Sequence, residues 1–235
     1  MKILVIGKGR MGSLIETTAL SHGHEVIGKV DIFDSDQILN TSCDVVIDFS
    51  HRDNVKWVCE YCKEKNASLV MGTTGLEEEH MESLHALSKT NAVFFSYNYS
   101  YGVAVMRKAL ELVTPLLEKD FDIEMVEKHH NQKADAPSGT AMMLLDTLDP
   151  EKEYKHVFGR QGMVGKRQKE IGISAIRGGS VAGEHTVFYF GQDETISITH
   201  NATSRQIFVN GAIKAAEFIV NQEPGFYSMD DLLNQ

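Results

Sequence analysis

The chain begins with a short apolar segment that runs directly into a glycine-rich turn. After residues 2–6, glycines form the spacing G-x-G-x-x-G, and an amphipathic helical pattern follows at once. In a strand-turn-helix unit, Gly7 permits the tight turn, Gly9 lets the backbone come close to a ligand, and Gly12 lets the helix pack closely on the strand. This start favours an α/β fold with a parallel sheet.

The same rhythm of short strand, turn and amphipathic helix continues through residues 1–100. Apolar runs predict five strands, at 2–6, 25–30, 44–49, 67–71 and 92–96. Helical patterns fill the gaps between them. Such alternation is typical of a doubly wound, Rossmann-like parallel sheet whose faces are covered by helices.

A second unit is predicted to begin near residue 101, where the pattern changes. A long helical stripe over 105–117 precedes an alternating strand over 121–125. Residues 151–170 are polar and contain glycine, so we expect a solvated loop there. β-branched and aromatic residues predict three more strands, packed antiparallel, at 171–177, 185–191 and 194–200. The second unit is therefore expected to be an α+β domain with a mixed or antiparallel sheet.

Composition and charge exclude several classes of protein. The 235 residues are 42% hydrophobic and 24% charged, which excludes disordered and fibrous chains. The formal net charge of −10 leaves no basic excess for a nucleic-acid surface. No run approaches the roughly 20 apolar residues that cross a bilayer, and the first apolar run is too short for a secretion signal. We expect a cytoplasmic protein that binds neither nucleic acid nor a membrane.

Three cysteines fit a reducing compartment. Cys59 and Cys62 form a C-x-x-C spacing that also occurs at redox and metal sites. They share a helical apolar pattern with Val55 and Val58, and no second Cys or His pair stands at zinc-ligand spacing. We interpret them as core residues of a helix, with redox or metal chemistry as the alternative.

An acidic residue stands where a dinucleotide fold would hold a ribose. Asp31 ends the second predicted strand, 24 positions after Gly7, and could accept hydrogen bonds from an adenosine ribose diol. A carboxylate there repels a 2′-phosphate, and Ile32 follows instead of an arginine, so NADH is expected to serve at least as well as NADPH. Nearby cations, Lys29 among them, could partly reverse this preference. The alternative is a glycine turn that holds no ligand.

Two further loops follow predicted strands. They are Asp48-Phe49-Ser50 and Gly72-Thr73-Thr74-Gly75. Ligands of open α/β sheets bind at the carboxyl ends of the strands, so both loops are candidates for cofactor contacts. The alternative is that both are ordinary turns, in which these residue types are common.

The segment from Glu127 to Ala141 carries the most chemistry. It places His129, His130 and Lys133 at the exit of a strand, and Pro-Ser-Gly-Thr then opens a helix whose free amides suit a carboxylate. Adjacent residues of an extended segment point in opposite directions, so the two imidazoles are expected to serve different groups. A metal site is the rival interpretation, but no third ligand stands at a telling spacing. Plain surface histidines are the other alternative.

These residues resemble the 4-hydroxy-tetrahydrodipicolinate (dihydrodipicolinate) reductase family over nearly the whole chain. The segment His129–Ala141 is the most specific part, and it is supported by Arg177-Gly178-Gly179, Gly183-Glu184-His185-Thr186-Val187 and His200–Arg205. The resemblance implies NAD(P)H-dependent reduction of a small dicarboxylate to tetrahydrodipicolinate in diaminopimelate and lysine biosynthesis. It also implies a dinucleotide-binding domain of residues 1–100 and 204–235. Residues 101–203 would bind substrate and assemble a homotetramer.

The resemblance also implies roles for individual residues. His129 is the expected acid/base and Lys133 a proton donor, while His130, Ser138, Gly139 and Thr140 contact the substrate. The expected cofactor contacts are Gly7, Lys8, Gly9, Arg10, Met11, Gly12, Asp31, Phe49, Gly72, Thr73, Thr74, Gly75, Tyr97, Asn98, Tyr99 and Ser100. No metal is expected.

The sequence departs from the family pattern at a few positions. Arg52 replaces a common proline, and Tyr97 and Tyr99 replace smaller residues or phenylalanine, which affects local cofactor contacts more than the reaction. Two other functions stay open: a related nicotinamide dehydrogenase acting on a different small acid, and a non-catalytic dinucleotide sensor. The first has no need of the His-His-Lys segment, and the second could lose its proton donors.

Overall fold

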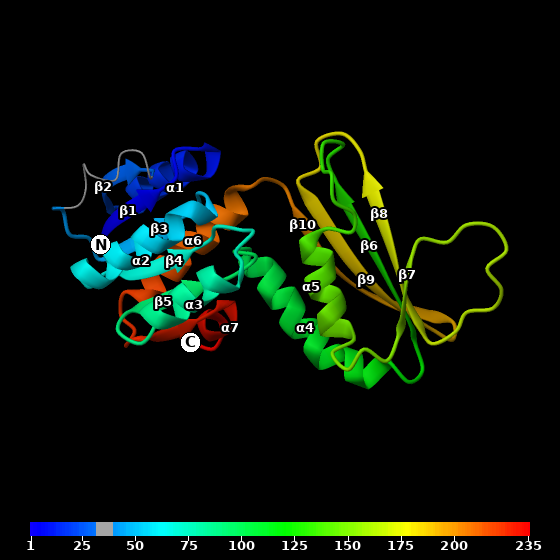
Figure 1. The fold of residues 1–235 in the computed structure, drawn as a ribbon. Helices are drawn as coiled ribbons and strands as arrows, with labels where there is room; N and C mark the ends of the chain where they lie inside the picture. Colours follow the sequence, from blue (N-terminus) through cyan, green and yellow to red (C-terminus); the bar gives the residue numbers. More distant parts are fainter. Residues whose placement is uncertain (32–39) are drawn as a thin grey trace. The chain divides into compact units, whose positions relative to one another are not determined.

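The computed structural model describes residues 1–31 and 40–235. The chain forms two compact units (Figure 1). Unit 1 consists of Met1–Tyr101 and Gln206–Gln235, so both ends of the chain belong to it. Unit 2 consists of Gly102–Arg205. Among the described residues, no helix combines the length and the apolar character needed to cross a membrane.

Unit 1 is built on a six-stranded sheet in the order β11-β5-β4-β3-β1-β2, and every pairing in it is parallel. Its strands are β1 (Lys2–Ile6), β2 (Glu25–Val30), β3 (Val45–Asp48), β4 (Ser68–Met71), β5 (Ala92–Phe95) and β11 (Gly225–Tyr227). The five predicted strands are confirmed to within one residue at each end, and so is the Rossmann-like fold. The short edge strand β11 was not predicted, because its three residues carry no periodic signal.

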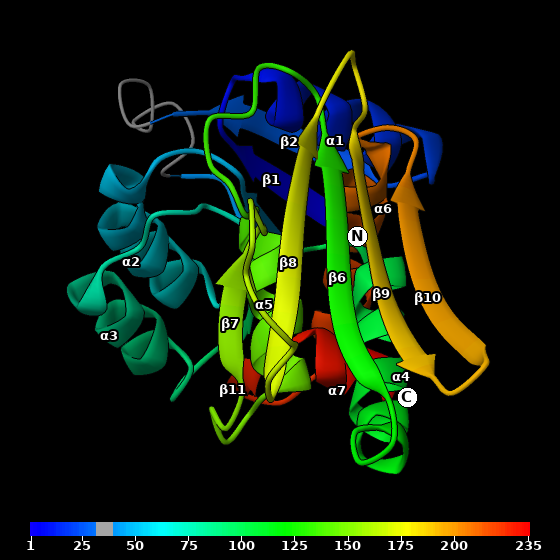
Figure 2. The same cartoon turned by 90° about the vertical axis from the view of Figure 1, so that its right-hand side faces the viewer.

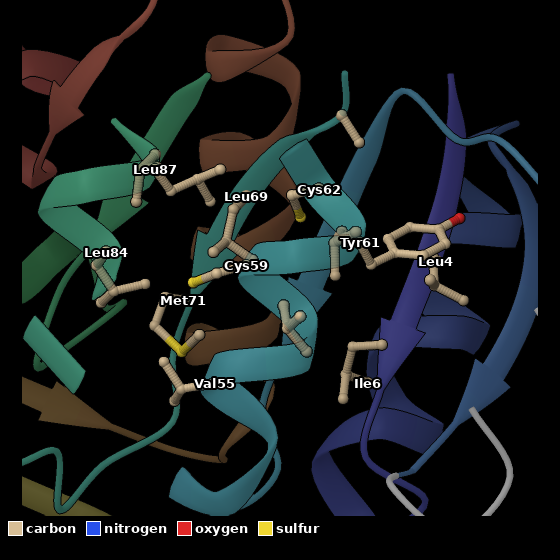
Figure 3. Close-up of a cluster of buried hydrophobic side chains, with 14 of the residues drawn as sticks. Leu4, Ile6, Val55, Cys59, Tyr61, Cys62, Leu69, Met71, Leu84 and Leu87 are labelled. Atoms are coloured by element: carbon tan, nitrogen blue, oxygen red, sulfur yellow. The ribbon is translucent and has the colours of Figure 1, made fainter. Parts of the chain in front are cut away.

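Helices cover both faces of this sheet. They are α1 (Arg10–Ser21), α2 (Val55–Lys65), α3 (Glu78–Leu87), α6 (Gln206–Ile219) and α7 (Met229–Leu233), with a 3-10 turn η2 (Arg52–Asn54) before α2. α2 and α3 pack on one face through a shared apolar cluster (Figure 3). α6 packs against α1 and against β3, β4 and β5. Helix α6, which follows unit 2 in the chain, thus packs on unit 1.

The C-x-x-C cysteines belong to that cluster. Cys59 and Cys62 lie on the inner face of α2 at 9% and 0% exposure, beside Leu69 and Met71 of β4 (Figure 3). Burial raises the pKa of the Cys59 thiol to about 12 and that of Cys62 well above its usual value, so neither forms the thiolate that redox or metal chemistry needs. The interpretation of both as core residues is confirmed.

Unit 2 contains a five-stranded mixed sheet in the order β10-β9-β6-β8-β7, with two helices packed on one face (Figure 2). The elements are α4 (Tyr101–Leu117), β6 (Asp122–His129), α5 (Gly139–Leu148), β7 (Lys155–Phe158), β8 (Glu170–Arg177), β9 (Gly183–Gly191) and β10 (Glu194–Ala202). Leu110 of α4 and Leu144 of α5 meet Met125, Ile173 and Tyr189 of the sheet in one buried cluster. The predicted α+β domain with a mixed sheet is confirmed.

Two details of the prediction for unit 2 are wrong. Residues 151–170 were expected to form a loop, yet they include β7, a four-residue edge strand whose backbone pairs with β8. β8 was expected to pack antiparallel but pairs in parallel with both β6 and β7, whereas β9 and β10 are antiparallel as predicted. The predicted direction of β8 is wrong because residues 159–169 carry the chain from the end of β7 back to the edge of the sheet where β7 starts. Such a crossover makes neighbouring strands parallel whatever their composition.

Candidate functional site

The glycine turn joins β1 to α1 at the carboxyl end of the unit 1 sheet. A Cβ on Gly12 would lie 1.9 Å from the Gly7 carbonyl oxygen, so only glycine lets α1 approach the strand this closely. In contrast, no described atom lies within 4 Å of a Cβ built on Gly9. Gly9 is the N-cap of α1 and supplies no side-chain cap. The first amides of α1 are therefore available to bind a phosphate.

The loops after β3 and β4 are tied together by a buried carboxylate, Asp48. Its Oδ1 accepts hydrogen bonds from the Ser50 amide (3.0 Å), from Ser50 Oγ (2.6 Å) and from Thr73 Oγ1 (2.8 Å). The Phe49 ring covers Gly72, where a Cβ would lie 2.3 Å from Phe49 Cζ. The structure thus brings together the predicted residues Phe49, Gly72 and Thr73, and it adds Ser50 and Asp48 as their support.

Asp31 lies at the end of β2, where Asn54 Nδ2 donates a hydrogen bond to its Oδ1 at 2.9 Å. The same nitrogen donates to a serine hydroxyl in the loop after β3 at 2.7 Å, so one amide links both loops. Lys29, which was considered as a counterweight to the Asp31 charge, pairs instead with Glu16 at 2.5 Å. Ile32, on which the NADH expectation also rests, lies outside the described residues.

The remaining predicted cofactor residues differ in accessibility. Tyr97 is 75% exposed, whereas Tyr99 is 2% exposed and donates its hydroxyl proton to the Met71 carbonyl at 2.7 Å. The Tyr99 ring therefore belongs to the core of unit 1, and a contact between this residue and the cofactor stays a prediction. Ser100 is buried as well, at 1% exposure. The others are exposed or half-buried, either on loops or, for Arg10 and Met11, in the first turn of α1: Lys8, Arg10, Met11, Thr74, Gly75 and Asn98.

Asp48 carries a testable pH dependence. Burial raises its pKa from 3.8 to about 6, and the hydrogen bonds from Ser50 and Thr73 only partly oppose this. The folded protein thus holds the Asp48 proton more tightly than the unfolded chain. The stability that this proton provides is complete below about pH 4 and is lost as the pH rises through about 6.

We expect Asp48→Asn to remove this contribution. Relative to wild type, the variant should gain stability between pH 4 and 6, by an amount on the order of 3 kcal/mol for a shift of about two pKa units. Urea unfolding of both proteins across pH 4–8 measures the difference. Asp53→Asn, at an exposed carboxylate, is the control. A constant offset for Asp48→Asn would contradict the prediction.

The histidine and lysine segment leaves the carboxyl end of β6 in unit 2. His129 is the last residue of β6 and is 9% exposed, whereas the adjacent His130 is half-buried. Lys133 Nζ lies 2.7 Å from Asp135 Oδ1, and this hydrogen bond lowers the pKa of the Asp135 carboxyl. A substrate carboxylate that binds Lys133 would therefore replace Asp135 as its partner.

Glu127 is completely buried beside His129. Its Oε2 lies 2.6 Å from His129 Nδ1, and Arg177 donates to both carboxylate oxygens, at 2.8 and 2.7 Å. Burial alone would raise the pKa of Glu127, but the hydrogen bonds from Arg177 and His129 outweigh it and hold the pKa below its usual value. Glu127 is therefore ionised at neutral pH.

Ser138 opens helix α5 and joins it to this cluster. Its amide donates to Glu127 Oε1 at 3.1 Å, and its Oγ accepts the Ala141 amide at 3.1 Å as the N-cap of the helix. A Cβ on Gly139 would meet no described atom within 4 Å, and the next residue, Thr140, is half-buried. The start of α5 is thus fixed beside the histidines, with room for a ligand at Gly139.

His185 of β9 completes the cluster. Its Nε2 lies 2.9 Å from Ser138 Oγ, and its ring centroid is 5.2 Å from that of His129. Burial, reinforced by the positive charge that His129 can carry, lowers the pKa of His185 to about 4. His185 is therefore neutral at pH 7 and serves as a structural partner of the Ser138 cap.

Sequence reasoning gave no role to Glu127, Arg177, His185 or Asn54. Glu127 could have been found, because residues two apart on a strand share a face and it stands two before His129. Arg177 and His185 reach the cluster from other strands, which no local spacing indicates. Two groups of described residues bring metal-ligating atoms together, and neither includes His129 or His130: His22, His24 and Glu217; and Glu77, Glu79 and His80.

Family models described as the N-terminus and the C-terminus of dihydrodipicolinate reductase match residues 1–99 and 102–233. The chain belongs to the dihydrodipicolinate reductase family. Members named 4-hydroxy-tetrahydrodipicolinate reductase include one from Clostridium tetani, 40% identical over 100% of this chain and 97% of its own length. Another, from Staphylococcus aureus strain N315, is 44% identical over 99% of this chain and all of its own length. The resemblance seen in the sequence is confirmed.

Solved structures support the fold of a dihydrodipicolinate reductase. The dipicolinate-bound dihydrodipicolinate reductase from Paenisporosarcina sp. TG-14 has a TM-score of 0.80 at 20% identity, over 97% of each chain. The scyllo-inositol dehydrogenase from Lactobacillus casei, solved with NAD(H) and scyllo-inositol, has a TM-score of 0.58 at 13% identity, over 99% of this chain and 93% of its own. The family therefore shares its architecture with other nicotinamide enzymes.

Proposed function

We propose that this protein catalyses the NAD(P)H-dependent reduction of 4-hydroxy-tetrahydrodipicolinate to tetrahydrodipicolinate, in diaminopimelate and lysine biosynthesis. The observation that carries this proposal is the buried cluster around His129 in a chain that matches reductases over its full length. A sensor that only binds dinucleotide has no use for an ion-paired histidine. A dehydrogenase for another acid has no need of His129, Lys133 and the Ser138 helix start together.

Unit 1 supplies residues that fit a nicotinamide dinucleotide. The open space at Gly9 and the uncapped start of α1 suit the pyrophosphate. Asp31, oriented by Asn54, suits the adenosine ribose diol. When bound, the reduced cofactor supplies a hydride. Phe49, Gly72 and Thr73 stand at the sheet edge where the nicotinamide half would be held.

Unit 2 supplies the groups for the substrate. The amides at the start of α5, together with Thr140, can bind one carboxylate of the substrate. Lys133 and His130 can contact the negatively charged substrate as well. Hydride addition to the conjugated ring raises the electron density toward the ring nitrogen, which then needs a proton. In this proposal His129 holds that proton and Lys133 assists in its delivery. The Glu127 carboxylate stabilises the positive charge on His129 before transfer.

The proposal is tested by mixing recombinant protein with freshly generated substrate and either NADH or NADPH. We expect the absorbance of the reduced cofactor to fall, and pyridine-2,6-dicarboxylate to compete with the substrate. Because Asp31 repels a 2′-phosphate and Lys29 is paired with Glu16, kcat/KM for NADH should equal or exceed that for NADPH. Stable absorbance with both cofactors would overturn the proposed function.

We propose that the subunits associate through the face of the unit 2 sheet that α4 and α5 do not cover. Phe188 and Phe190 stack there, with ring centroids 5.6 Å apart, and Phe190 is 42% exposed. Exposed apolar side chains on a sheet face favour association with a second copy. We propose a homotetramer in the cytoplasm, built through this sheet. Analytical ultracentrifugation should give four times the chain mass of 26.2 kDa, and a monomer would contradict it.

A further inference from the structure

The Glu127 carboxylate is surrounded by donors from its own strand and from two other segments. It accepts hydrogen bonds from both terminal nitrogens of Arg177 in β8, from the Ser138 amide at the start of α5, and from His129 Nδ1. The side chain is 0% exposed, so no water competes for these contacts. An ionised carboxylate only accepts hydrogen bonds, and therefore the hydrogen between Glu127 and His129 resides on Nδ1.

We propose that Glu127 is the positioning residue of the reaction: it holds His129 in the tautomer whose Nε2 faces the substrate, and Arg177 holds Glu127. This inference rests on the proposed function. With Nδ1–H directed to Glu127, the neutral ring has its lone pair on Nε2. Nε2 takes up a proton, and Glu127 stabilises the imidazolium that forms. Nε2 then delivers this proton to the substrate.

A second observation concerns the space beside Nε2, on the ring edge opposite Glu127. A Cβ on Gly183, the first residue of β9, would lie 3.0 Å from His129 Nε2. Such a contact is tighter than side chains ordinarily make, so any larger residue would crowd this atom. The glycine therefore leaves the Nε2 edge of the ring clear, while the Nδ1 edge is occupied by Glu127.

The surrounding charges show why an anion is needed at this position. Arg177 from β8 and Lys133 from the loop after β6 are cations, and the neighbouring imidazoles His185 and His200 come from β9 and β10. Without a carboxylate between Arg177 and His129, the guanidinium would disfavour a proton on the ring. Glu127 separates the two and lets His129 become positively charged beside an arginine.

Glu127→Gln is the decisive variant because it is nearly isosteric. The Oε1 position receives two N–H donors, from Ser138 and from one Arg177 nitrogen, so the amide oxygen takes that position. The NH2 group then takes the Oε2 position, where it faces His129 Nδ1 and the other Arg177 nitrogen. That NH2 group donates to Nδ1 and forces the ring hydrogen onto Nε2. In hydrolytic triads, the equivalent exchange of carboxylate for amide lowers kcat by about 10⁴ through the same change of tautomer.

We expect Glu127→Gln to lower kcat by about 10²-fold or more, with the KM for substrate changed by less than about threefold. Glu127→Asp, which keeps the charge on a shorter stem, should recover part of the loss. The control is Glu124→Gln on the same strand, because Glu124 is likewise held by both terminal nitrogens of an arginine, Arg160. Its kcat should stay within about twofold of wild type.

The ¹⁵N NMR spectrum of labelled His129 provides a readout that does not depend on turnover. Wild type and Glu124→Gln should show the Nδ1–H tautomer at high pH, and Glu127→Gln the Nε2–H tautomer. An Nε2–H tautomer in wild type, or an unchanged kcat in a folded Glu127→Gln, would overturn the inference. If wild type reduces no substrate, the proposed function fails, while the tautomer assignment is still decided by the spectrum.

Discussion

Replacing His129 by glutamine should lower kcat by about 10²–10⁴-fold and leave the KM for substrate nearly unchanged. Glutamine fills similar space and still offers the Glu127 carboxylate an amide donor, so the local structure should persist. What it lacks is a group that can gain and lose a proton. Steady-state kinetics with varied substrate at saturating cofactor measure both parameters.

The matched control is His130→Gln, at the neighbouring half-buried imidazole. If His130 contacts the substrate without exchanging its proton, this variant should raise KM more than it lowers kcat. A His129→Gln enzyme with normal turnover and weakened substrate binding would show that His129 is a binding residue. Equal effects of the two substitutions on kcat would also contradict the assigned division of roles.

A pair of glycine substitutions should separate folding from cofactor binding in unit 1. Gly12→Ala places a Cβ 1.9 Å from the Gly7 carbonyl oxygen, so α1 or the turn must move. Such overpacking costs roughly 1–3 kcal/mol of unfolding free energy, and the displaced amides should raise the KM for NADH by about tenfold or more. Urea unfolding and steady-state kinetics give the two values.

Gly9→Ala is the counterpart, because a Cβ at Gly9 meets no described atom within 4 Å. Its unfolding free energy should change by less than about 1 kcal/mol, the cost of a poorer N-cap. Its KM for NADH should still rise, since the new methyl group occupies the space proposed for the pyrophosphate. If Gly9→Ala binds NADH as wild type does, the phosphate does not lie at this turn.

The local elements could be predicted wherever a segment carries its own signal. Strands β1, β3, β4 and β5 are largely buried on both faces and read as continuous apolar runs, which explains their accurate bounds. The helical pattern of Cys59 and Cys62 was likewise sufficient to place them in the core. In contrast, β7 gains its pairing from the backbone of β8, and its four residues carry no apolar period of their own.

The sequence by itself determined the fold of unit 1, the family and the segment that holds His129 and Lys133, because each depends on short-range spacing. Only the tertiary structure decided that the Tyr99 ring belongs to the core and that Arg177 and His185 meet Glu127. The contacts of Arg177 and His185 with this cluster join residues about 50 to 60 positions apart in the chain. They exist because the register of β6, β8 and β9 aligns the partners, and no periodicity within one segment encodes the register of another.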